Sequence, residues 1–399
     1  MKKKYSIATI MLATALTFAG CANDNEAPKN ETTQEQGTEV VKEEQTDQED
    51  KKEETSAVEE VKEEEEKSEE TPDEKSEEKE DETSENTNPA EMGNLVLHRA
   101  YPQETDERSF TTVVVATSGD KIVDAIIDEY QYFEDGGDYK AVPNSDDKFG
   151  EGTAEGKILG SKIENDEPYS AAMKGAGGEI SLLDNYNAIA DFVKGKTIAE
   201  LEDFLNENDE EKVLDAVTGA TFKSTPNLIK MIVETAKDNT FATSGDAENP
   251  DTVEIRYALG APHGTGAFAN TVVAVEGDKI VAANIDEYQY LEGGKGLPGS
   301  DKGFGEGYAD SNVVLGSKLE NNDMYSDLMA EKAKSTVSIK DNYNAIENFA
   351  AGKTIEELKS VISSAKPGEG IDEVTGATLV DTAGYLQLIV DAAENNIRK

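Results

Sequence analysis

Two threonines, Thr221 and Thr378, end the same seven-residue pattern. The chain reads DAVTGAT up to Thr221 and DEVTGAT up to Thr378, and a predicted helix begins within a few residues of each, near Ser224 and Asp381. The glycine permits a tight turn. Helix starts carry unpaired backbone N–H groups and a positive dipole end, so a hydroxyl held there lies in a site suited to phosphate. An isolated TGAT is more simply a capped turn before a surface helix. Its recurrence favours a shared chemistry.

Two glycine patterns suggest dinucleotide binding but lack the required context. GTGAFA at 264–269 leads into a predicted strand, and GKGLPG at 294–299 contains a proline and leads into no helix. A dinucleotide fingerprint needs strand, glycine turn and helix in that order. The sequence therefore does not favour a nucleotide fold of this kind.

The elements that position the threonines occur twice, in an internal repeat. GDKIVDAIIDEYQYFE at 119–134 returns as GDKIVAANIDEYQYLE at 277–292, and FGEG, LGSK, DNYNAI and GKTI also recur, at an offset of about 157 residues. A fixed offset of this kind indicates two copies of one domain. We predict a first domain over 91–240, a linker over 241–250 and a second domain over 251–399.

Each copy begins with β-branched runs around a central Gly-Asp, which predict a β-hairpin. DNYNAI and the TIAELEDFLNE or TIEELKSVISSA stretches then predict helices, the latter capped by threonine with a glutamate near the third position. A last helix follows the TGAT pattern. Strands and helices are segregated along each copy, so we expect an α+β fold.

The N-terminus explains the one cysteine of the chain, Cys21. A basic start, a short apolar stretch and small residues before Cys21 resemble a bacterial lipoprotein signal over 1–20, with cleavage before a lipidated Cys21. An ordinary secretory signal is the alternative. The remainder of 21–90 is so rich in Glu, Lys, Ser and Thr that we predict a disordered acidic tether.

The composition excludes several classes of function. Lys and Arg total 38 against 85 Asp and Glu, a net charge of −47, so we expect no nucleic-acid partner. One cysteine cannot make an intrachain disulfide or a cysteine-based zinc or iron–sulfur site, and two histidines make a histidine-rich metal site hard to build. We expect no metal.

Asp-x-x-Thr-Gly-Ala-Thr resembles the flavinylation motif of FMN-binding domains, as in subunits of the sodium-pumping NADH:quinone reductase and of the Rnf complex. That resemblance implies FMN joined through its phosphate to Thr221 and Thr378 by an ApbE-type flavin transferase that uses FAD and magnesium. The family pattern often has a hydroxyl residue three positions on, which Ser224 matches and Asp381 does not. The resemblance also assigns recognition and turn roles to Asp215, Thr218, Gly219, Ala220, Asp372, Thr375, Gly376 and Ala377.

Lipoprotein signal, tether and two such domains together resemble the flavin lipoproteins of Gram-positive extracellular electron transfer. This implies a lipid-anchored carrier on the outer face of the cell membrane, with two covalent FMN groups and no catalytic residues of its own. Electrons would come from a membrane quinone-linked NADH dehydrogenase and pass to ferric iron or free flavins. The excised signal segment at 13–20 would serve as a peptide pheromone.

Aromatic residues of the repeated segments are candidates to stack on the flavin. The alternative, favoured for any one of them, is a place in the core. These residues are Tyr130, Tyr132, Tyr186, Tyr288, Tyr290 and Tyr343.

Two other functions remain open. One is a lipoprotein that captures a flavin or nutrient non-covalently for a transporter. The other is a secreted reductase, which would need an FAD-binding domain that no remaining stretch encodes.

Overall fold

The computed structural model describes residues 93–103, 107–366 and 368–395. The predicted signal peptide, Cys21, the tether and the segment at 13–20 lie outside the described residues, so their predictions stay predictions. The described residues all belong to one compact unit, Asn86–Lys399, in which both repeats lie.

Each repeat builds an antiparallel sheet. The first sheet has the order β4-β3-β2-β1-β5 and the second the order β6-β7-β8-β9. The strands of the first are β1 (Leu95–Ala100), β2 (Ser109–Ser118), β3 (Lys121–Glu134), β4 (Lys157–Ser161) and β5 (Thr243–Gly245). Those of the second are β6 (Glu254–Gly260), β7 (Ala267–Glu276), β8 (Lys279–Glu292) and β9 (Val313–Ser317).

The predicted Gly-Asp hairpins are confirmed. Ser118 pairs with Lys121 and Glu276 with Lys279 across the two turns, and the turn glycines, Gly119 and Gly277, have φ of 62° and 66°. The two-residue turns whose twist matches that of the flanking strands need a residue with positive φ. The turn residues therefore set the register of both hairpins.

The helices follow the strands in each copy, as the α+β prediction expects. In the first copy they are α1 (Asp166–Gly175), α2 (Leu182–Val193), α3 (Ile198–Glu207), α4 (Glu210–Ala216) and α5 (Thr225–Lys237). In the second they are α6 (Asn322–Ala333), α7 (Ile339–Ala350), α8 (Ile355–Ser364) and α9 (Thr382–Glu394). Short 3-10 turns are η2 (Gly150–Gly152), η3 (Pro250–Thr252) and η4 (Phe304–Gly307).

Capping by threonine is confirmed in both copies. The Thr197 hydroxyl accepts the Glu200 N–H while the Glu200 carboxylate accepts the Thr197 N–H, and Thr354 and Glu357 repeat the arrangement. This reciprocal capping box satisfies two donors at each helix start.

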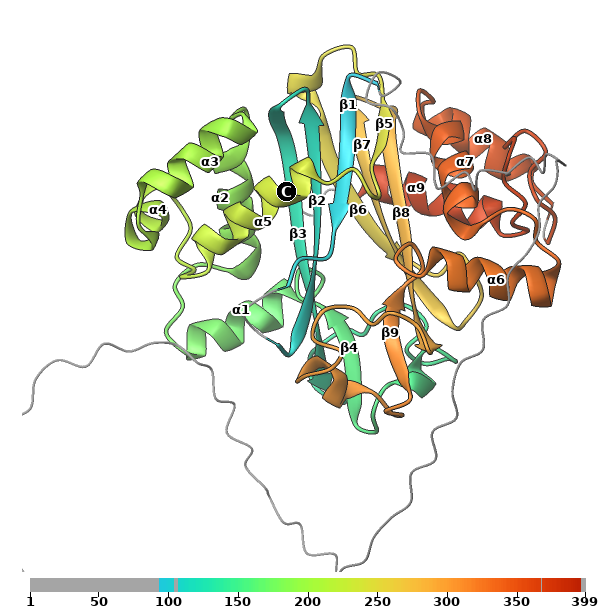
Figure 1. Cartoon of the computed structure of the whole chain (residues 1–399), viewed down its shortest axis with the longest axis horizontal. Coiled ribbons are helices and arrows are strands. Elements are labelled where there is room, and N and C mark those ends of the chain that lie inside the picture. The colour runs from blue at the N-terminus through green and yellow to red at the C-terminus, as the bar shows by residue number, and fades with distance from the viewer. Residues whose placement is uncertain (1–92, 104–106, 367, 396–399) are drawn as a thin grey trace, which may run out of the picture. The chain divides into compact units, whose positions relative to one another are not determined.

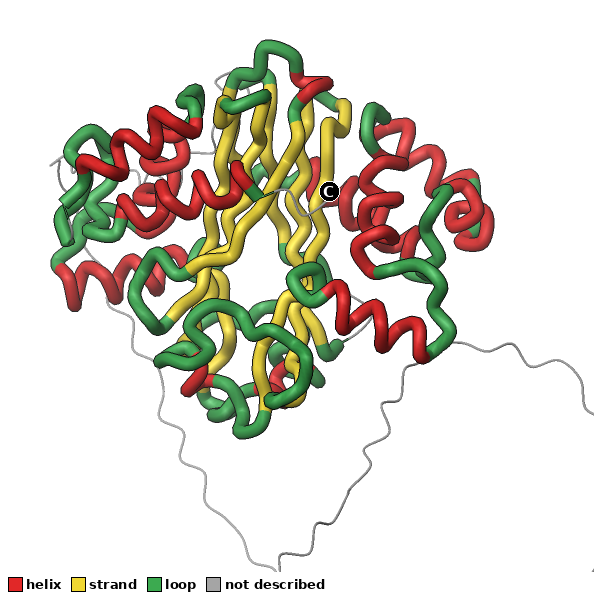
Figure 2. The backbone as a smooth tube through the Cα atoms, turned by 180° about the vertical axis from the view of Figure 1, so that it is seen from behind, coloured by secondary structure: helices red, strands yellow, loops and turns green. Residues whose placement is uncertain are grey.

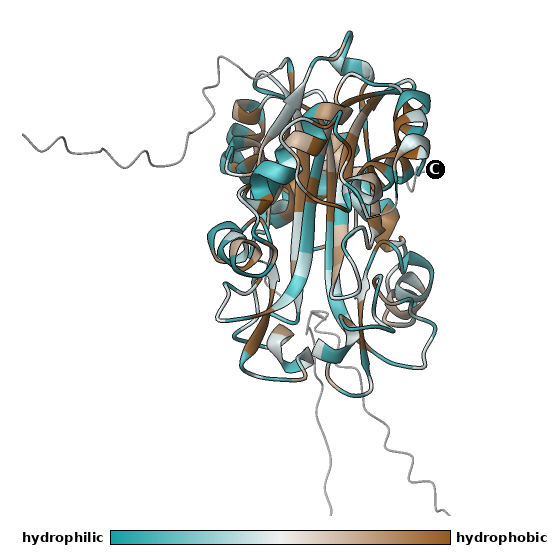
Figure 3. Ribbon diagram, turned by 90° about the vertical axis from the view of Figure 1, so that its right-hand side faces the viewer, coloured by the Kyte–Doolittle hydropathy of each residue, from teal (hydrophilic) through white to brown (hydrophobic). Residues whose placement is uncertain are grey.

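The sheets lie between two groups of helices (Figures 1 and 2). Helices α2 and α5 contact β3 and β2, while α7 and α9 contact β8, β6 and β7. The two sheets contact each other through β1 with β8 and β3 with β6. Hydrophobic residues run along the strands between the flanking helices (Figure 3). The order of layers is helix, sheet, sheet, helix.

The segment predicted as a linker, 241–250, contains a paired strand. β5 is antiparallel to β1, with Leu95 opposite Gly245. A Cβ on Gly245 would lie 1.8 Å from the carbonyl oxygen of Val281 in β8, so only glycine fits between the sheets. The polar composition predicted a turn-rich connection. Instead, the backbone N–H and C=O groups of β5 pair with β1, and the segment extends the first sheet.

The copies meet in a nearly reciprocal contact. Ala154 donates its N–H to the Gly307 carbonyl and Ala309 donates to the Gly152 carbonyl, both at 2.9 Å. The hydroxyls of Tyr132 and Tyr290 are 2.7 Å apart. A pairing in which each copy offers the other the same groups is the pattern of a two-fold dimer.

Candidate functional site

The two TGAT patterns form the same turn. Gly219 has φ of 98° and Gly376 has φ of 99°, a region that other residues rarely adopt. The Ala220 N–H donates to the Val217 carbonyl at 3.0 Å, and Ala377 donates to Val374 at 3.2 Å. The glycine in each pattern is therefore required by the backbone, and the turn presents the following threonine on the surface.

In the first copy Asn185 of α2 holds the threonine. Its side-chain oxygen accepts the Thr221 N–H at 2.6 Å and the Phe222 N–H at 3.2 Å, and it lies 3.3 Å from the Thr221 hydroxyl oxygen. The Asn185 amide nitrogen donates to the Ser181 carbonyl at 2.7 Å. Asn185 is fully buried, whereas Thr221 is exposed.

Asn342 of α7 does the same in the second copy. Its side-chain oxygen accepts the Thr378 N–H at 2.7 Å and lies 3.2 Å from the Thr378 hydroxyl oxygen. Its amide donates to the Ser338 carbonyl at 2.8 Å. Neither asparagine was among the predicted site residues. Both belong to the repeated DNYNAI segment, whose recurrence is the signal that points to them.

Each exposed threonine precedes a helix whose first residues lack a side-chain cap. In the described structure neither Ser224 before α5 nor Asp381 before α9 makes a capping hydrogen bond with its side chain. Backbone N–H groups at such a start attract anionic oxygens. Both sites thus combine an accessible hydroxyl with a nearby helix start that lacks a side-chain cap.

The remaining predicted site residues lie in or beside the turns. Thr218 and Thr375 are exposed within them, and Ala220 and Ala377 pack partly against the cores. The acidic pair, Asp215 and Asp372, is exposed on the surface before each turn. An exposed carboxylate there can be reached by another protein, which is compatible with a recognition role.

A cavity of about 500 Å³ lies beside Thr378. Leu328, Met329, Ile339, Leu379 and Val380 give it apolar walls, with His263, Lys332, Lys334 and Asp381 among its polar residues. Among the described residues, Val380 is the large hydrophobic side chain that is exposed, at 53 %. Ligand pockets commonly span about 300–1,000 Å³ with mostly apolar walls and a few polar groups. An aromatic ring fits the apolar walls of this cavity, and the ammonium groups of Lys332 and Lys334 have the charge that a phosphate needs.

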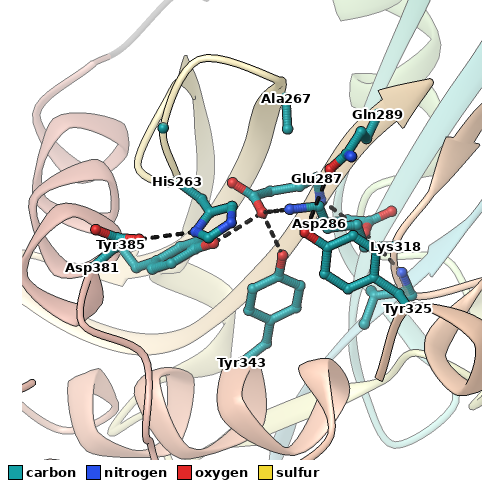
Figure 4. A network of polar contacts seen from close by, with 12 residues as sticks. His263, Ala267, Asp286, Glu287, Gln289, Lys318, Tyr325, Tyr343, Asp381 and Tyr385 are labelled. Atoms are coloured by element: carbon teal, nitrogen blue, oxygen red, sulfur yellow. Dashed lines mark hydrogen bonds and ion pairs between the residues drawn. The ribbon is translucent and has the colours of Figure 1, made fainter. Parts of the chain in front are cut away.

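A buried acid, Glu287 of β8, stands at the centre of a polar network that also includes Tyr325, a residue that lines this cavity (Figure 4). Its Oε2 accepts hydrogen bonds from Lys318 at 2.6 Å, Tyr343 at 2.8 Å and Tyr385 at 2.9 Å. Burial raises the pKa of Glu287, but the Lys318 ammonium with its hydrogen bond, the charge of His263 and the Tyr343 hydrogen bond together outweigh burial, so the pKa lies below its ordinary value. Glu287 is therefore an anion at neutral pH.

Four of the candidate tyrosines lie away from the turns. Tyr130 and Tyr288 are fully buried, and they form one aromatic cluster with Phe110 and Phe268 between the two sheets. Tyr132 and Tyr290 pack against the same cluster. Their place in the core follows from the pairing of the copies.

The other two tyrosines lie next to the asparagines of the sites. Tyr186 and Tyr343 are buried, and their hydroxyls donate to Glu129 and Glu287. In the first copy Phe222 also packs edge-on to Tyr186, with ring centroids 6.1 Å apart. These tyrosines support the sites from within.

None of the helices in the described residues has the length and apolar character to cross a membrane. A scan against protein-family models found no match, and searches of curated proteins and of solved structures found none either.

Proposed function

We propose that this chain is a lipid-anchored extracellular electron carrier with two FMN groups, each joined through its phosphate to Thr221 or Thr378. A membrane quinone-linked dehydrogenase would supply the electrons, and ferric iron or free flavins would accept them. When bound, the ring system would supply reversible uptake of electrons and protons. The protein would be a carrier and the substrate of an ApbE-type flavin transferase.

One observation carries the proposal. Two segments 157 residues apart present an exposed threonine hydroxyl in the same turn, with the same buried asparagine behind it and a helix start in front. In each copy the asparagine accepts the backbone N–H of the threonine, and this bond does not need the side-chain hydroxyl. The stability of the turn therefore does not explain why the exposed residue is a threonine. The arrangement suits a hydroxyl that is to be modified.

The modification balances without a redox step. The threonine Oγ forms a bond to the FMN phosphorus of FAD, the bond from that phosphorus to AMP breaks, and the hydroxyl proton is lost. Asn185 or Asn342 holds the threonine backbone in place, and the magnesium ion belongs to the transferase. The transferase would also take up the hydroxyl proton.

The cavity beside Thr378 favours a second candidate function, non-covalent capture of a flavin or another aromatic nutrient. Its apolar walls and polar rim would hold such a ligand without a bond to threonine. In that case the ligand would be lost on denaturation, and a flavin transferase would not be needed.

Intact mass measurement separates the two. We expect the chain produced with a flavin transferase and FAD to gain two FMN groups less water, located in peptides that contain Thr221 and Thr378. The Thr221→Val and Thr378→Val chains should each gain one. A folded chain that gains no mass, yet binds flavin reversibly, would support capture instead.

A further inference from the structure

Two tyrosines from different helices meet on one oxygen atom in the second copy. Tyr343 of α7 and Tyr385 of α9 donate to Oε2 of Glu287 at 2.8 and 2.9 Å, and both hydroxyls point at this carboxylate (Figure 4). Their ring centroids are 5.5 Å apart. All three side chains are buried. One carboxylate of β8 therefore ties α7 and α9 to the same place on the sheet.

These two helices carry the two parts of the second site. Asn342 stands directly before Tyr343 on α7, and its side-chain oxygen accepts the Thr378 N–H at 2.7 Å. Successive residues of a helix point about 100° apart, so the bond made by Tyr343 also fixes the direction of Asn342. Tyr385 is the fourth residue of α9, the helix that follows the Thr378 turn. Glu287 therefore holds the asparagine from one side and the turn from the other.

The last helix of the first copy cannot make the corresponding bond. Leu228 of α5 stands where α9 has Tyr385, seven residues after the threonine, and it is a buried core residue without a donor group. Glu129, which corresponds to Glu287, accepts a hydrogen bond from Tyr186 of α2. The carboxylate of the first copy thus anchors the helix with the asparagine, while α5 has no hydroxyl to offer at this point.

A different residue secures the turn of the first copy. Phe222, directly after Thr221, packs edge-on against Tyr186 with ring centroids 6.1 Å apart, and its N–H donates to Asn185 at 3.2 Å. The second copy has Leu379 at this position, which offers no aromatic edge. The two copies therefore hold the same turn by different means. The first uses the residue after the threonine, and the second uses the helix beyond it.

Stability does not explain why a charged group stands below the second site. Lys318 donates to Glu287 at 2.6 Å, and both side chains are fully buried. A buried ion pair contributes little net stability, because desolvation costs about as much as the attraction returns. A charged acceptor does make shorter and stronger hydrogen bonds than a neutral one. Burial and the Glu287 charge raise the pKa values of Tyr343 and Tyr385 well above 10, so both hydroxyls remain donors at neutral pH.

We infer that Glu287 is a positioning residue of the second site. Through its two tyrosines it holds the Thr378 turn against Asn342. This role rests on the proposed function, because a threonine in a fixed place is what a flavin transferase needs. Leu228 replaces Tyr385 in the first copy, so the Tyr385 hydroxyl contributes to attachment at Thr378 and not to attachment at the other threonine.

The test removes single hydroxyl groups, because Glu287→Gln would leave the buried Lys318 ammonium without its partner. Tyr385→Phe keeps the ring and deletes one bond to Glu287. The matched control is Tyr257→Phe, which deletes a bond of 2.8 Å from another buried tyrosine to another carboxylate, that of Glu164. The two variants therefore lose the same kind of contact at different places.

Hydrogen exchange reports the turn without any flavin. Exchange of the backbone amides in the peptide that contains Thr378 is followed by mass spectrometry in the full chain. We expect Tyr385→Phe to speed this exchange about tenfold, because loss of a hydrogen bond to a charged group makes local opening more frequent. Tyr257→Phe should leave the exchange of this peptide unchanged.

Flavin attachment is measured next, with a flavin transferase and FAD. Thr221 on the same chain is the internal reference. We expect the initial rate at Thr378, relative to that at Thr221, to fall about fivefold in Tyr385→Phe. The Tyr257→Phe chain should keep the ratio of the unaltered chain.

Unchanged exchange in Tyr385→Phe would overturn the inference. So would an equal increase in Tyr257→Phe, because a loss of overall stability would then explain both. Faster exchange with an unchanged attachment ratio would also overturn it, since the contact would then have no part in modification. Absence of covalent FMN from both threonines of the unaltered chain would overturn the proposed function, while the hydrogen-exchange comparison would still decide whether Tyr385 holds the turn.

Discussion

The side-chain oxygen of Asn185 accepts the Thr221 backbone N–H at 2.6 Å, across 36 residues of sequence. Replacing Asn185 with Ala leaves that N–H unpaired and frees the threonine. We expect flavin occupancy of Thr221 to fall about tenfold or more. The reason is that the lost positioning contact contributes roughly 1–3 kcal/mol.

Peptide mass spectrometry on one Asn185→Ala preparation tests this, because Thr378 on the same chain reports the transferase level. Asn342→Ala should lower the flavin occupancy of Thr378 and leave that of Thr221 as the internal reference. Full occupancy of both threonines in either variant would show that the asparagines are structural only.

The turn glycines should be equally sensitive. Ala at position 219 must adopt φ near 98°, and its Cβ would meet Ala188 at 3.3 Å. We expect a loss of about 1–3 kcal/mol in unfolding free energy and reduced flavin attachment at Thr221 alone. The control is Gly175→Ala at the end of α1, where a Cβ meets nothing within 4 Å and φ is not positive. Equal urea midpoints for the two variants would contradict this.

Arg99 should be a large contributor to stability. It is fully buried on β1 and donates to Asn270 at 3.0 Å and to Asn284 in the other copy's sheet. Arg99→Met leaves both amide oxygens without this donor, and we expect a loss of about 3 kcal/mol or more. Urea unfolding followed by circular dichroism measures it. Lys230→Met on the exposed face of α5 is the control, with a change near zero.

Glu347 on α7 predicts a pH dependence of stability. Burial raises its pKa from 4.5 to about 8, while its Oε1 accepts the Ile285 N–H at 2.6 Å. The folded chain therefore holds this proton up to about pH 8, whereas the unfolded chain loses it near pH 4.5. Its contribution is full below pH 4.5 and falls by about 1.4 kcal/mol per pH unit until about pH 8.

Glu347→Gln should remove that slope, as measured by urea unfolding at pH 5, 6, 7 and 8. Asp128, whose pKa burial raises to about 7, adds a slope of the same sign in both chains, so the comparison is between variants. The exposed Glu331→Gln is the control. Parallel profiles for wild type and Glu347→Gln would show that Glu347 is ionised in the fold.

Local signals in the sequence were sufficient for the hairpins and capped helices. The Gly-Asp turns and the Thr-x-x-Glu helix starts depend only on residues that are close together in the sequence. Both are therefore visible in the sequence of each copy. The turn before each site was also predictable, because glycine at positive φ leaves a local signature.

Long-range packing was not predictable in the same way. The role of Asn185 depends on how α2 is placed against a turn that lies 36 residues further on. Tyr130 and Tyr288 could have faced a cofactor or a core, and the answer depends on the second copy covering the first. His263 gains its surroundings from three separate segments of the second copy.

The reciprocal contact of the two copies has a consequence for assembly. A Cβ on Gly152 would lie 2.2 Å from the Tyr290 ring, and one on Gly307 would lie 2.1 Å from the Tyr132 ring. Each copy thus receives the other's aromatic side chain against bare backbone. Because one chain links the copies, their effective concentration is fixed by that linkage and not by the amount of protein. The pairing therefore withstands any dilution, and every molecule carries its two sites in a ratio of one to one.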